Sequence, residues 1–184
     1  NVKKEKGKGK SEKGKGKSEK GKNSRKGKKG KADKKEEHNG PIDWMGWEEM
    51  VDTQQEDPGL VFIDIYTHWC GPCKLLDKKT FHDQKVASFI NEHFHPVKMN
   101  AEMKDTIRFR GKNYKNTKPG FEKSSPRQRG KPHELPLKLV DGRLAYPTMV
   151  VLDKKMGRVK MIRGYKSPSK LLKALRPLVE EKKE

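Results

Sequence analysis

The pattern of apolar and polar positions predicts an alternation of helices and strands from residue 41 onward. Apolar residues spaced three or four positions apart predict helices at residues 41–57, 70–79, 83–91 and from Ser167 onward. Short runs rich in β-branched and aromatic residues predict strands at residues 60–66, 94–99, 148–152 and 158–162. The first of these runs is almost wholly apolar, which is typical of a strand buried on both faces of a mostly parallel sheet. This order of elements predicts an α/β sandwich.

The pattern is weaker between residues 101 and 142. Residues 106–114, around Gly111, predict a small hairpin, and residues 115–131 are rich in Lys, Ser, Pro and Gly, which predicts a loop. A short helix is predicted at residues 132–140, although Pro136 is expected to disturb it.

Charge changes the picture at the N-terminus. Of the net charge of +20, residues 1–40 supply +11, from 17 Lys/Arg and 6 Asp/Glu, and they contain no aromatic residue. The heptapeptide at residues 8–14 recurs unchanged at residues 15–21. Such a segment buries too little apolar surface to offset its chain entropy, so residues 1–40 are predicted to form a disordered Lys/Gly-rich tail. The tail is either a solubilising tether or a partner for an anionic surface.

The location of the protein is predicted from its ends and its hydropathy. No stretch approaches the roughly 18 apolar residues of a membrane helix. The chain begins at Asn1 rather than Met. A removed signal peptide would fit a tail that spaces the domain from a membrane, so a periplasmic or cell-envelope location is expected, with the cytoplasm as the alternative.

The chain contains two cysteines, in the sequence Cys70-Gly71-Pro72-Cys73. They are open to three explanations: a redox pair, half of a zinc site, or an inert structural disulfide. A helix that begins at Cys70 would place its sulfur beside unpaired backbone N–H groups, which stabilise the nucleophilic thiolate. Cys73 would then lie one turn further on, near enough to attack a mixed disulfide.

The two alternatives have less support. A zinc site needs two further ligands, and although His68 and His82 are available, no second cysteine pair completes such a site. A disulfide that closes a two-residue loop stabilises little, because the entropic gain grows with loop size. The redox pair is therefore favoured, with neither a metal nor another cofactor.

Several separated motifs resemble those of thioredoxins. Residues 61–74 resemble their active-site strand and turn, in the sequence VFIDIYTHWCGPCK. The resemblance implies a buried Asp64 paired with Lys98, a cis-proline at Pro147 after Tyr146, and a family glycine at Gly164. It spans about residues 42–180 and implies the thioredoxin fold, a central mixed sheet flanked by helices.

A narrower resemblance is to thioredoxin-like proteins of bacterial envelopes, related to the thioredoxin modules of thiol–disulfide interchange proteins. It is carried by Trp44-Met45 and by residues 79–81, in the sequence KTF. The interval between Lys98 and Pro147 is longer than in thioredoxins, which predicts an insertion at about residues 104–143 within a domain of residues 41–184. Its apolar residues are expected to pack beside Pro147 and to influence which disulfides are accepted; they are Phe109, Tyr114, Phe121, Leu135, Leu137 and Leu139.

The resemblance also implies the roles of the catalytic residues. Cys70 is expected to attack a protein disulfide, and Cys73, expected to be the more buried of the two, to resolve the mixed disulfide. Asp64 is the candidate base, with Lys98 modulating its charge.

Substrate contacts are expected from Trp69, Gly71, Pro72, Tyr146 and Pro147. The predicted function is a thiol–disulfide oxidoreductase that reduces protein disulfides and depends on an unidentified upstream electron donor. The alternatives are a thioredoxin-fold binding or scaffold protein and a metallochaperone.

Overall fold

The computed structural model describes residues 40–118 and 129–180, so residues 1–39 of the predicted tail lie outside the described residues. The elements in chain order are α1 (Trp47–Glu56), β1 (Leu60–Tyr66), α2 (Gly71–Leu76), the π-helical turn η1 (Asp77–Phe81), α3 (Gln84–His93), β2 (Phe94–Asn100), β3 (Ile107–Phe109), β4 (Lys112–Tyr114), α4 (Glu134–Leu139), β5 (Thr148–Leu152), β6 (Arg158–Arg163) and α5 (Pro168–Glu180). Within these ranges no helix has both the length and the apolar character needed to cross a lipid bilayer.

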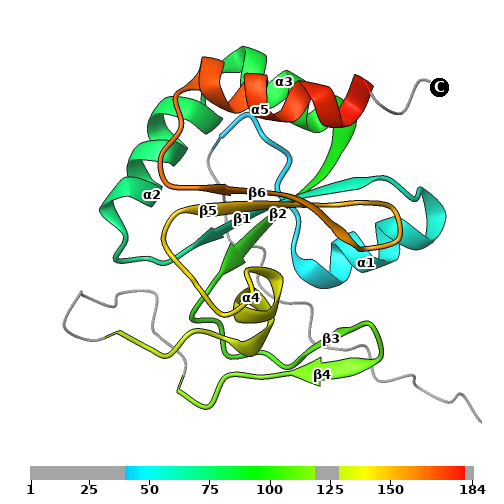
Figure 1. The fold of residues 1–184 in the computed structure, drawn as a ribbon, viewed down its shortest axis with the longest axis vertical. Coiled ribbons are helices and arrows are strands. Elements are labelled where there is room, and N and C mark those ends of the chain that lie inside the picture. The colour runs from blue at the N-terminus through cyan, green and yellow to red at the C-terminus, as the bar shows by residue number, and fades with distance from the viewer. Residues whose placement is uncertain (1–39, 119–128, 181–184) are drawn as a thin grey trace, which may run out of the picture. The chain divides into compact units, whose positions relative to one another are not determined.

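A mixed sheet with the strand order β2-β1-β5-β6 forms the centre of the described domain. β1 and β2 are parallel, whereas β5 pairs with both β1 and β6 in antiparallel orientation. In Figure 1, α2, α3 and α5 lie on one side of this sheet, and α1, α4 and the β3–β4 hairpin lie on the other. The central sheet flanked by helices is therefore present as expected.

Strand β1 is buried on both faces because its side chains alternate between two apolar clusters. Val61, Ile63 and Ile65 enter the cluster that α1, the hairpin and α4 cover. Leu60 and Phe62 enter the cluster that α2, α3 and α5 cover. Because β1 is packed on both faces, its end is held firmly in place, and so is the start of the turn that follows it.

The first helix begins later than the sequence pattern predicts. Met45 forms a parallel bridge with Val97 of β2, so the residues before Trp47 run along the sheet edge instead of forming a helix. Trp44 packs with its ring centroid 5.1 Å from that of Phe81, in the cluster opposite the one that contains Trp47. Two tryptophans committed to opposite faces of the sheet cannot share one face of a helix.

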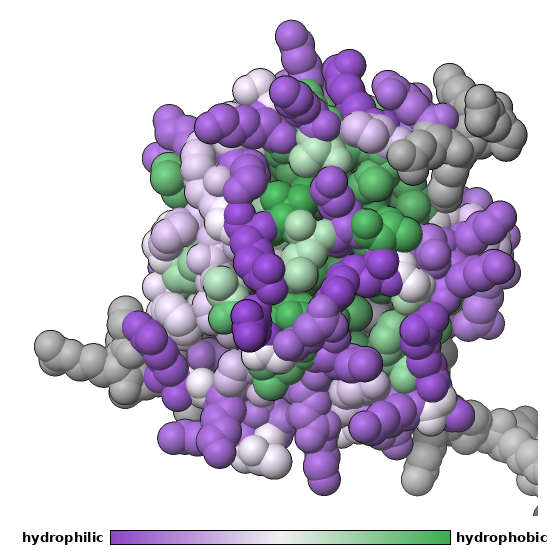
Figure 2. All heavy atoms as spheres, viewed as in Figure 1, coloured by the Kyte–Doolittle hydropathy of each residue, from purple (hydrophilic) through white to green (hydrophobic). Residues whose placement is uncertain are grey.

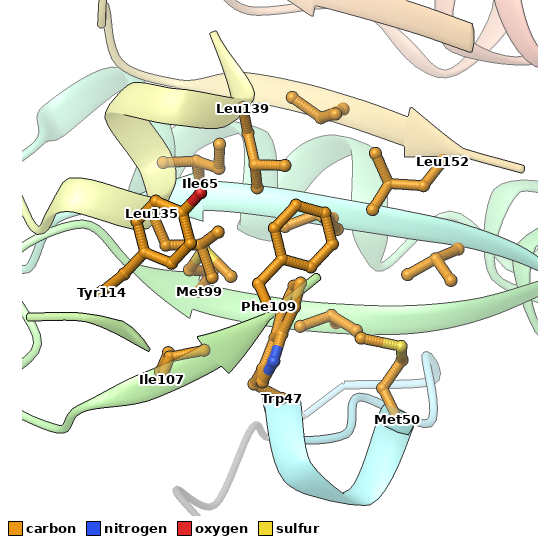
Figure 3. Packing of buried hydrophobic residues seen from close by; sticks show 14 of the residues in the cluster. Trp47, Met50, Ile65, Met99, Ile107, Phe109, Tyr114, Leu135, Leu139 and Leu152 are labelled. Atoms are coloured by element: carbon orange, nitrogen blue, oxygen red, sulfur yellow. The ribbon is translucent and has the colours of Figure 1, made fainter. Parts of the chain in front are cut away.

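The hairpin is present as predicted, and its turn lies at Arg110 and Gly111, which both have positive φ angles. Figure 3 shows Phe109 of the hairpin meeting Trp47 of α1, with ring centroids 5.5 Å apart. Helix α4 also forms despite Pro136, because the proline lies in its first turn, where backbone N–H groups have no helical partner.

The apolar side chains of residues 104–143 follow the predicted packing where they are described. Phe109, Tyr114, Leu135 and Leu139 are buried beneath the sheet, whereas Leu137 is half-buried. Phe121 lies outside the described residues. The described parts of this segment, residues 104–118 and 129–143, therefore share an apolar core with the sheet.

Candidate active site at the start of helix α2

The two cysteines are joined in a disulfide at the start of α2. Cys70 Sγ lies 2.10 Å from Cys73 Sγ, and the two Cα atoms are 5.3 Å apart. Cys70 is the N-cap of α2, and its sulfur accepts a hydrogen bond from the Cys73 N–H over 3.1 Å. Gly71 and Pro72 form the first helical positions, where proline removes no helical hydrogen bond. This geometry confirms the predicted helix N-terminus at Cys70.

The cap position has a chemical consequence for Cys70. Backbone N–H groups at the start of a helix carry partial positive charge and have no helical acceptor. A sulfur that accepts one of these N–H groups is stabilised more as a thiolate than as a thiol. When the disulfide is reduced, the geometry therefore favours the reactive form of Cys70.

Both cysteines are buried, contrary to the expectation that Cys73 would be the more buried. Cys70 is 3% exposed and Cys73 is 6% exposed. The cause is a cover of aromatic rings, because Tyr66, Trp69 and Tyr146 pack around the disulfide. The rings of Trp69 and Tyr146 meet edge to face, with centroids 5.5 Å apart.

Trp69 is held from two further sides. Its Nε1–H donates to Glu102 Oε1 over 2.9 Å, and Glu102 is itself only 3% exposed. The guanidinium of Arg129 lies 4.2 Å from the centroid of the Trp69 ring. Glu102 and Arg129 were not identified from the sequence, because neither belongs to a motif or a periodic apolar pattern.

The Tyr146-Pro147 peptide bond is cis, as the resemblance implied. The Pro147 carbonyl accepts a hydrogen bond of 2.8 Å from the N–H of Gly164. Gly164 has a φ of +72°, a conformation that glycine adopts without steric cost. Burial, with a smaller contribution from the negative charge of Glu102, raises the pKa of the Tyr146 hydroxyl to about 12. Tyr146 is therefore a neutral cover for the disulfide at physiological pH.

Asp64 and Lys98 meet across the sheet, as expected. The parallel register of β1 and β2 places the two residues opposite each other, and Lys98 Nζ lies 2.9 Å from Asp64 Oδ2. The same ammonium lies 2.7 Å from Oδ1 of Asp77, the first residue of η1. Asp77 was not identified from the sequence, although it lies two turns after Cys70 on the same continuous helix. Lys98 therefore links a buried carboxylate to a half-exposed one.

The surroundings of this trio determine its charge. The ammonium of Lys98 lies between 4.7 and 5.3 Å from the ring centroids of Trp44, Phe81 and Tyr66. Burial raises the pKa of Asp64 above its ordinary value, and Lys98 only partly offsets this. For Lys98, burial acts to lower the pKa, but the charges of Asp64 and Asp77 outweigh it and the pKa is raised.

Asp64 also retains unused hydrogen-bonding capacity. Its Oδ1 is buried and has no hydrogen-bond partner among the described residues. A buried carboxylate with a raised pKa and a free oxygen is suited to accept and return a proton.

The histidines weighed as metal ligands have other surroundings. Nδ1 of His82 lies 2.8 Å from the backbone oxygen of Asp77, and the ring of His68 packs edge-on against Tyr66. Across residues 40–118 and 129–180, no three His, Cys, Asp or Glu side chains are grouped so that they could hold a metal ion.

The chain is similar to known proteins in sequence. The family model described as Thioredox_DsbH, a protein of unknown function (DUF255), matches residues 31–117, just under half of the chain. An uncharacterised protein of Caenorhabditis elegans is 24% identical over 70 residues. These residues are 38% of this chain but only 10% of that relative, so the chain spans a small part of its length.

Solved structures are similar over most of the chain. A protein of Bacteroides thetaiotaomicron, proposed to be a disulphide-isomerase, is 26% identical with a TM-score of 0.50, covering 78% of this chain and 96% of that one. A thioredoxin of Thermus thermophilus is 16% identical with a TM-score of 0.53, covering 75% of this chain and 87% of the other. These findings confirm the resemblance and the fold that the sequence motifs implied.

Proposed function

We propose that this chain, a thioredoxin-fold protein, is a thiol–disulfide oxidoreductase that reduces disulfides in other proteins through Cys70 and Cys73. The observation that carries the proposal is the position of the Cys70–Cys73 disulfide at the N-terminus of α2. The helix start favours a thiolate on Cys70, and the Cys73 sulfur lies within bonding distance of it. A dithiol in this geometry can donate two electrons and close to a disulfide without moving the backbone far.

The reaction proceeds in two exchanges. The Cys70 thiolate attacks one sulfur of the substrate disulfide, forms a mixed disulfide and expels the other substrate sulfur as a thiolate, which takes up a proton. The Cys73 thiolate then attacks the Cys70 sulfur and releases the second substrate thiol. Two electrons have passed to the substrate, and the Cys70–Cys73 disulfide remains. A dithiol donor, as yet unidentified, returns two electrons for the next cycle.

Asp64 is proposed to take the proton from Cys73 before the second exchange. Its raised pKa and its unpaired oxygen support this role, and the neighbouring Lys98 stabilises its ionised form. Asp77 shares Lys98 with Asp64 and so moderates this stabilisation.

The substrate is proposed to approach over the residues that surround Cys70. Gly71 and Pro72 begin the helix, Trp69 and Tyr146 pack around the disulfide, and Pro147 directly follows Tyr146. The aromatic cover has to shift before a protein sulfur reaches Cys70, since that residue is almost fully buried. The resemblance to envelope proteins supports a periplasmic or envelope location, where disulfide-bonded substrates occur.

Insulin reduction by the full-length chain tests the proposal, with a chemical dithiol as electron source. Cys70→Ser is expected to abolish turnover, because no nucleophile remains. Cys73→Ser is expected to leave Cys70 able to attack, so that stable mixed disulfides with insulin accumulate. The two variants make the same chemical change and serve as controls for each other. Equal residual turnover in both would refute the assigned roles.

A further inference from the structure

The positive charge of residues 41–184 is unevenly distributed. Residues 104–143 contain 12 Lys/Arg and 4 Asp/Glu, a net charge of +8. Residues 41–103, which carry the cysteines, contain 5 Lys/Arg and 11 Asp/Glu, a net charge of −6. Residues 104–143 are thus strongly basic in sequence, whereas residues 41–103 are acidic.

The two faces of the β3–β4 hairpin carry different kinds of side chain, apolar on one and cationic on the other. Ile107, Phe109 and Tyr114 are buried against the sheet and α1. Arg108 and Lys112 are exposed, as is Arg110 in the turn. In Figure 2, hydrophilic side chains cover most of the lower part of the view, where β3, β4 and α4 lie. The apolar face anchors the hairpin, and its cations point to solvent.

These cations lack acidic partners. Within the described residues, none of Lys104, Arg108, Arg110, Lys112, Arg129 and Lys131 forms a salt bridge. By contrast, Arg158 pairs with Asp141 of the same segment at 2.6 Å, so ion pairs do form where an acid is within reach. Arg110 and Lys112 instead lie over the rings of Phe109 and Tyr114, at 5.9 and 5.5 Å from the centroids.

Arg129 places one cation of residues 104–143 at the redox site. Its guanidinium stacks on Trp69, the residue directly before Cys70. A guanidinium stacked on a ring keeps its in-plane N–H donors directed outward, where they match the two oxygens of a carboxylate. A carboxylate bound there would lie beside the sulfur that attacks the substrate.

From these observations we propose that the basic face of residues 104–118 and 129–131 binds an acidic segment of the substrate protein and that Arg129 places this segment next to Cys70. The inference rests on the proposed function and names the class of substrate that it favours. An acidic polypeptide is a better fit than nucleic acid because the hairpin rings face the core, which leaves no exposed aromatic surface there for base stacking.

Two synthetic peptides test the inference. They contain the same intramolecular disulfide, flanked by glutamates in one and by glutamines in the other. The full-length chain, reduced beforehand, is mixed with each peptide at low and at high salt, and the rate of peptide reduction is followed in a single turnover. The glutamate peptide is expected to react about tenfold faster at low salt, and high salt is expected to remove most of the preference.

Arg129→Gln is expected to lower the ratio of the glutamate-peptide rate to the glutamine-peptide rate about three- to fivefold. The triple variant Arg108→Gln, Arg110→Gln, Lys112→Gln is also expected to lower the rate with the glutamate peptide relative to the glutamine peptide. The matched control is Arg176→Gln, since this exposed arginine of α5 also lies near a ring, 6.0 Å from Phe89, but on the other side of the sheet. The control should leave the preference intact.

The outcomes separate the two proposals. If neither peptide is reduced, the proposed function fails. If both are reduced at equal rates, or if the preference survives in both the Arg129 and the triple variant, the docking inference is wrong and the proposed function stands. If the peptides react equally and a short oligothymidylate binds the wild type but not the triple variant, the face binds nucleic acid, which also overturns the inference.

Discussion

Lys98 governs the electrostatics on the buried side of the redox site. Its ammonium contacts one carboxylate that solvent does not reach and a second, Asp77, whose side chain is 45% exposed. Because one cation serves two anions, neither carboxylate is fully neutralised. The buried member, Asp64, pays the larger desolvation cost, so its proton is held more tightly than in the unfolded chain.

Replacement of Asp64 by Asn tests this arrangement through stability. The folded-state pKa of Asp64 is raised, so the wild type loses stability as pH rises from the unfolded value of 3.8 through the folded value. Asp64→Asn lacks this loss, while Lys98 keeps Asp77 as its partner. The variant should therefore equal the wild type at acidic pH and exceed it near neutrality, as measured by urea unfolding across pH.

The same variant should slow the resolution of a mixed disulfide by Cys73, on the order of 100-fold near neutral pH, because the proton acceptor is lost. Stopped-flow release of a thiol from the mixed disulfide measures this step. Asp52→Asn, at an exposed position of α1, is the control and should change neither quantity. Unchanged resolution in Asp64→Asn, at every pH, would assign Asp64 a structural role only.

At this scale, local motifs predicted some residues and missed others. The strand and turn around Cys70 identified Asp64 and both cysteines, since these lie within ten residues of one another. Glu102 and Arg129 reach Trp69 only after β2 and residues 104–143 have folded beside the turn. No periodicity or spacing in the sequence encodes these distant contacts.

At the scale of elements, the β3–β4 hairpin and α4 cover one apolar face of the central sheet. Phe109 connects the hairpin to helix α1, because its ring packs edge-on against that of Trp47. Figure 3 shows it at the centre of side chains from β1, β2, α1 and α4. The hairpin therefore contributes to the stability of the domain as well as to its surface.

Phe109→Ala should lower the free energy of unfolding by about 3 kcal/mol, since it removes a buried ring and leaves a cavity. Urea denaturation measures the change. Asn113→Ala, at an exposed position on the same hairpin, should stay within about 0.5 kcal/mol of the wild type. Similar values for the two variants would mean that the hairpin packs only loosely on the sheet.

Most helices and strands were predictable from the sequence, but the start of α1 was not. Apolar runs predicted β1 and β5, and an apolar stripe predicted α5, because burial of these residues leaves few alternatives. Residues 41–46 were assigned to a helix since Trp44, Trp47 and Met50 recur every three positions. The same spacing arises when a short extended segment runs directly into a helix, and only the opposed packing of the two tryptophans distinguishes the cases.

For the whole molecule, we expect the chemistry to reside in residues 41–184 and the excess charge of residues 1–40 to act separately. All of those first residues except Gly40 lie outside the described structure, and their composition offers almost nothing apolar to bury. Their lysines instead provide a high density of positive charge for anionic surfaces.

Deletion of residues 1–40 should leave insulin reduction within about twofold and the melting temperature nearly unchanged, because no packed contacts are lost. Binding to vesicles that contain anionic lipid should fall, and the remaining binding should depend less on salt. Sedimentation with neutral vesicles is the control. A large drop in melting temperature after the deletion would show that these residues pack against the domain.

The burial of Cys70 has a consequence for selectivity between electron carriers. A small thiol in the surrounding solution meets rings of Trp69 and Tyr146 before it meets sulfur, and it has too few contacts to offset the cost of displacing them. A protein partner that docks over a wider surface recovers that cost from the rest of its interface. We therefore expect this disulfide to exchange more slowly with a small thiol than with a protein that docks over the site.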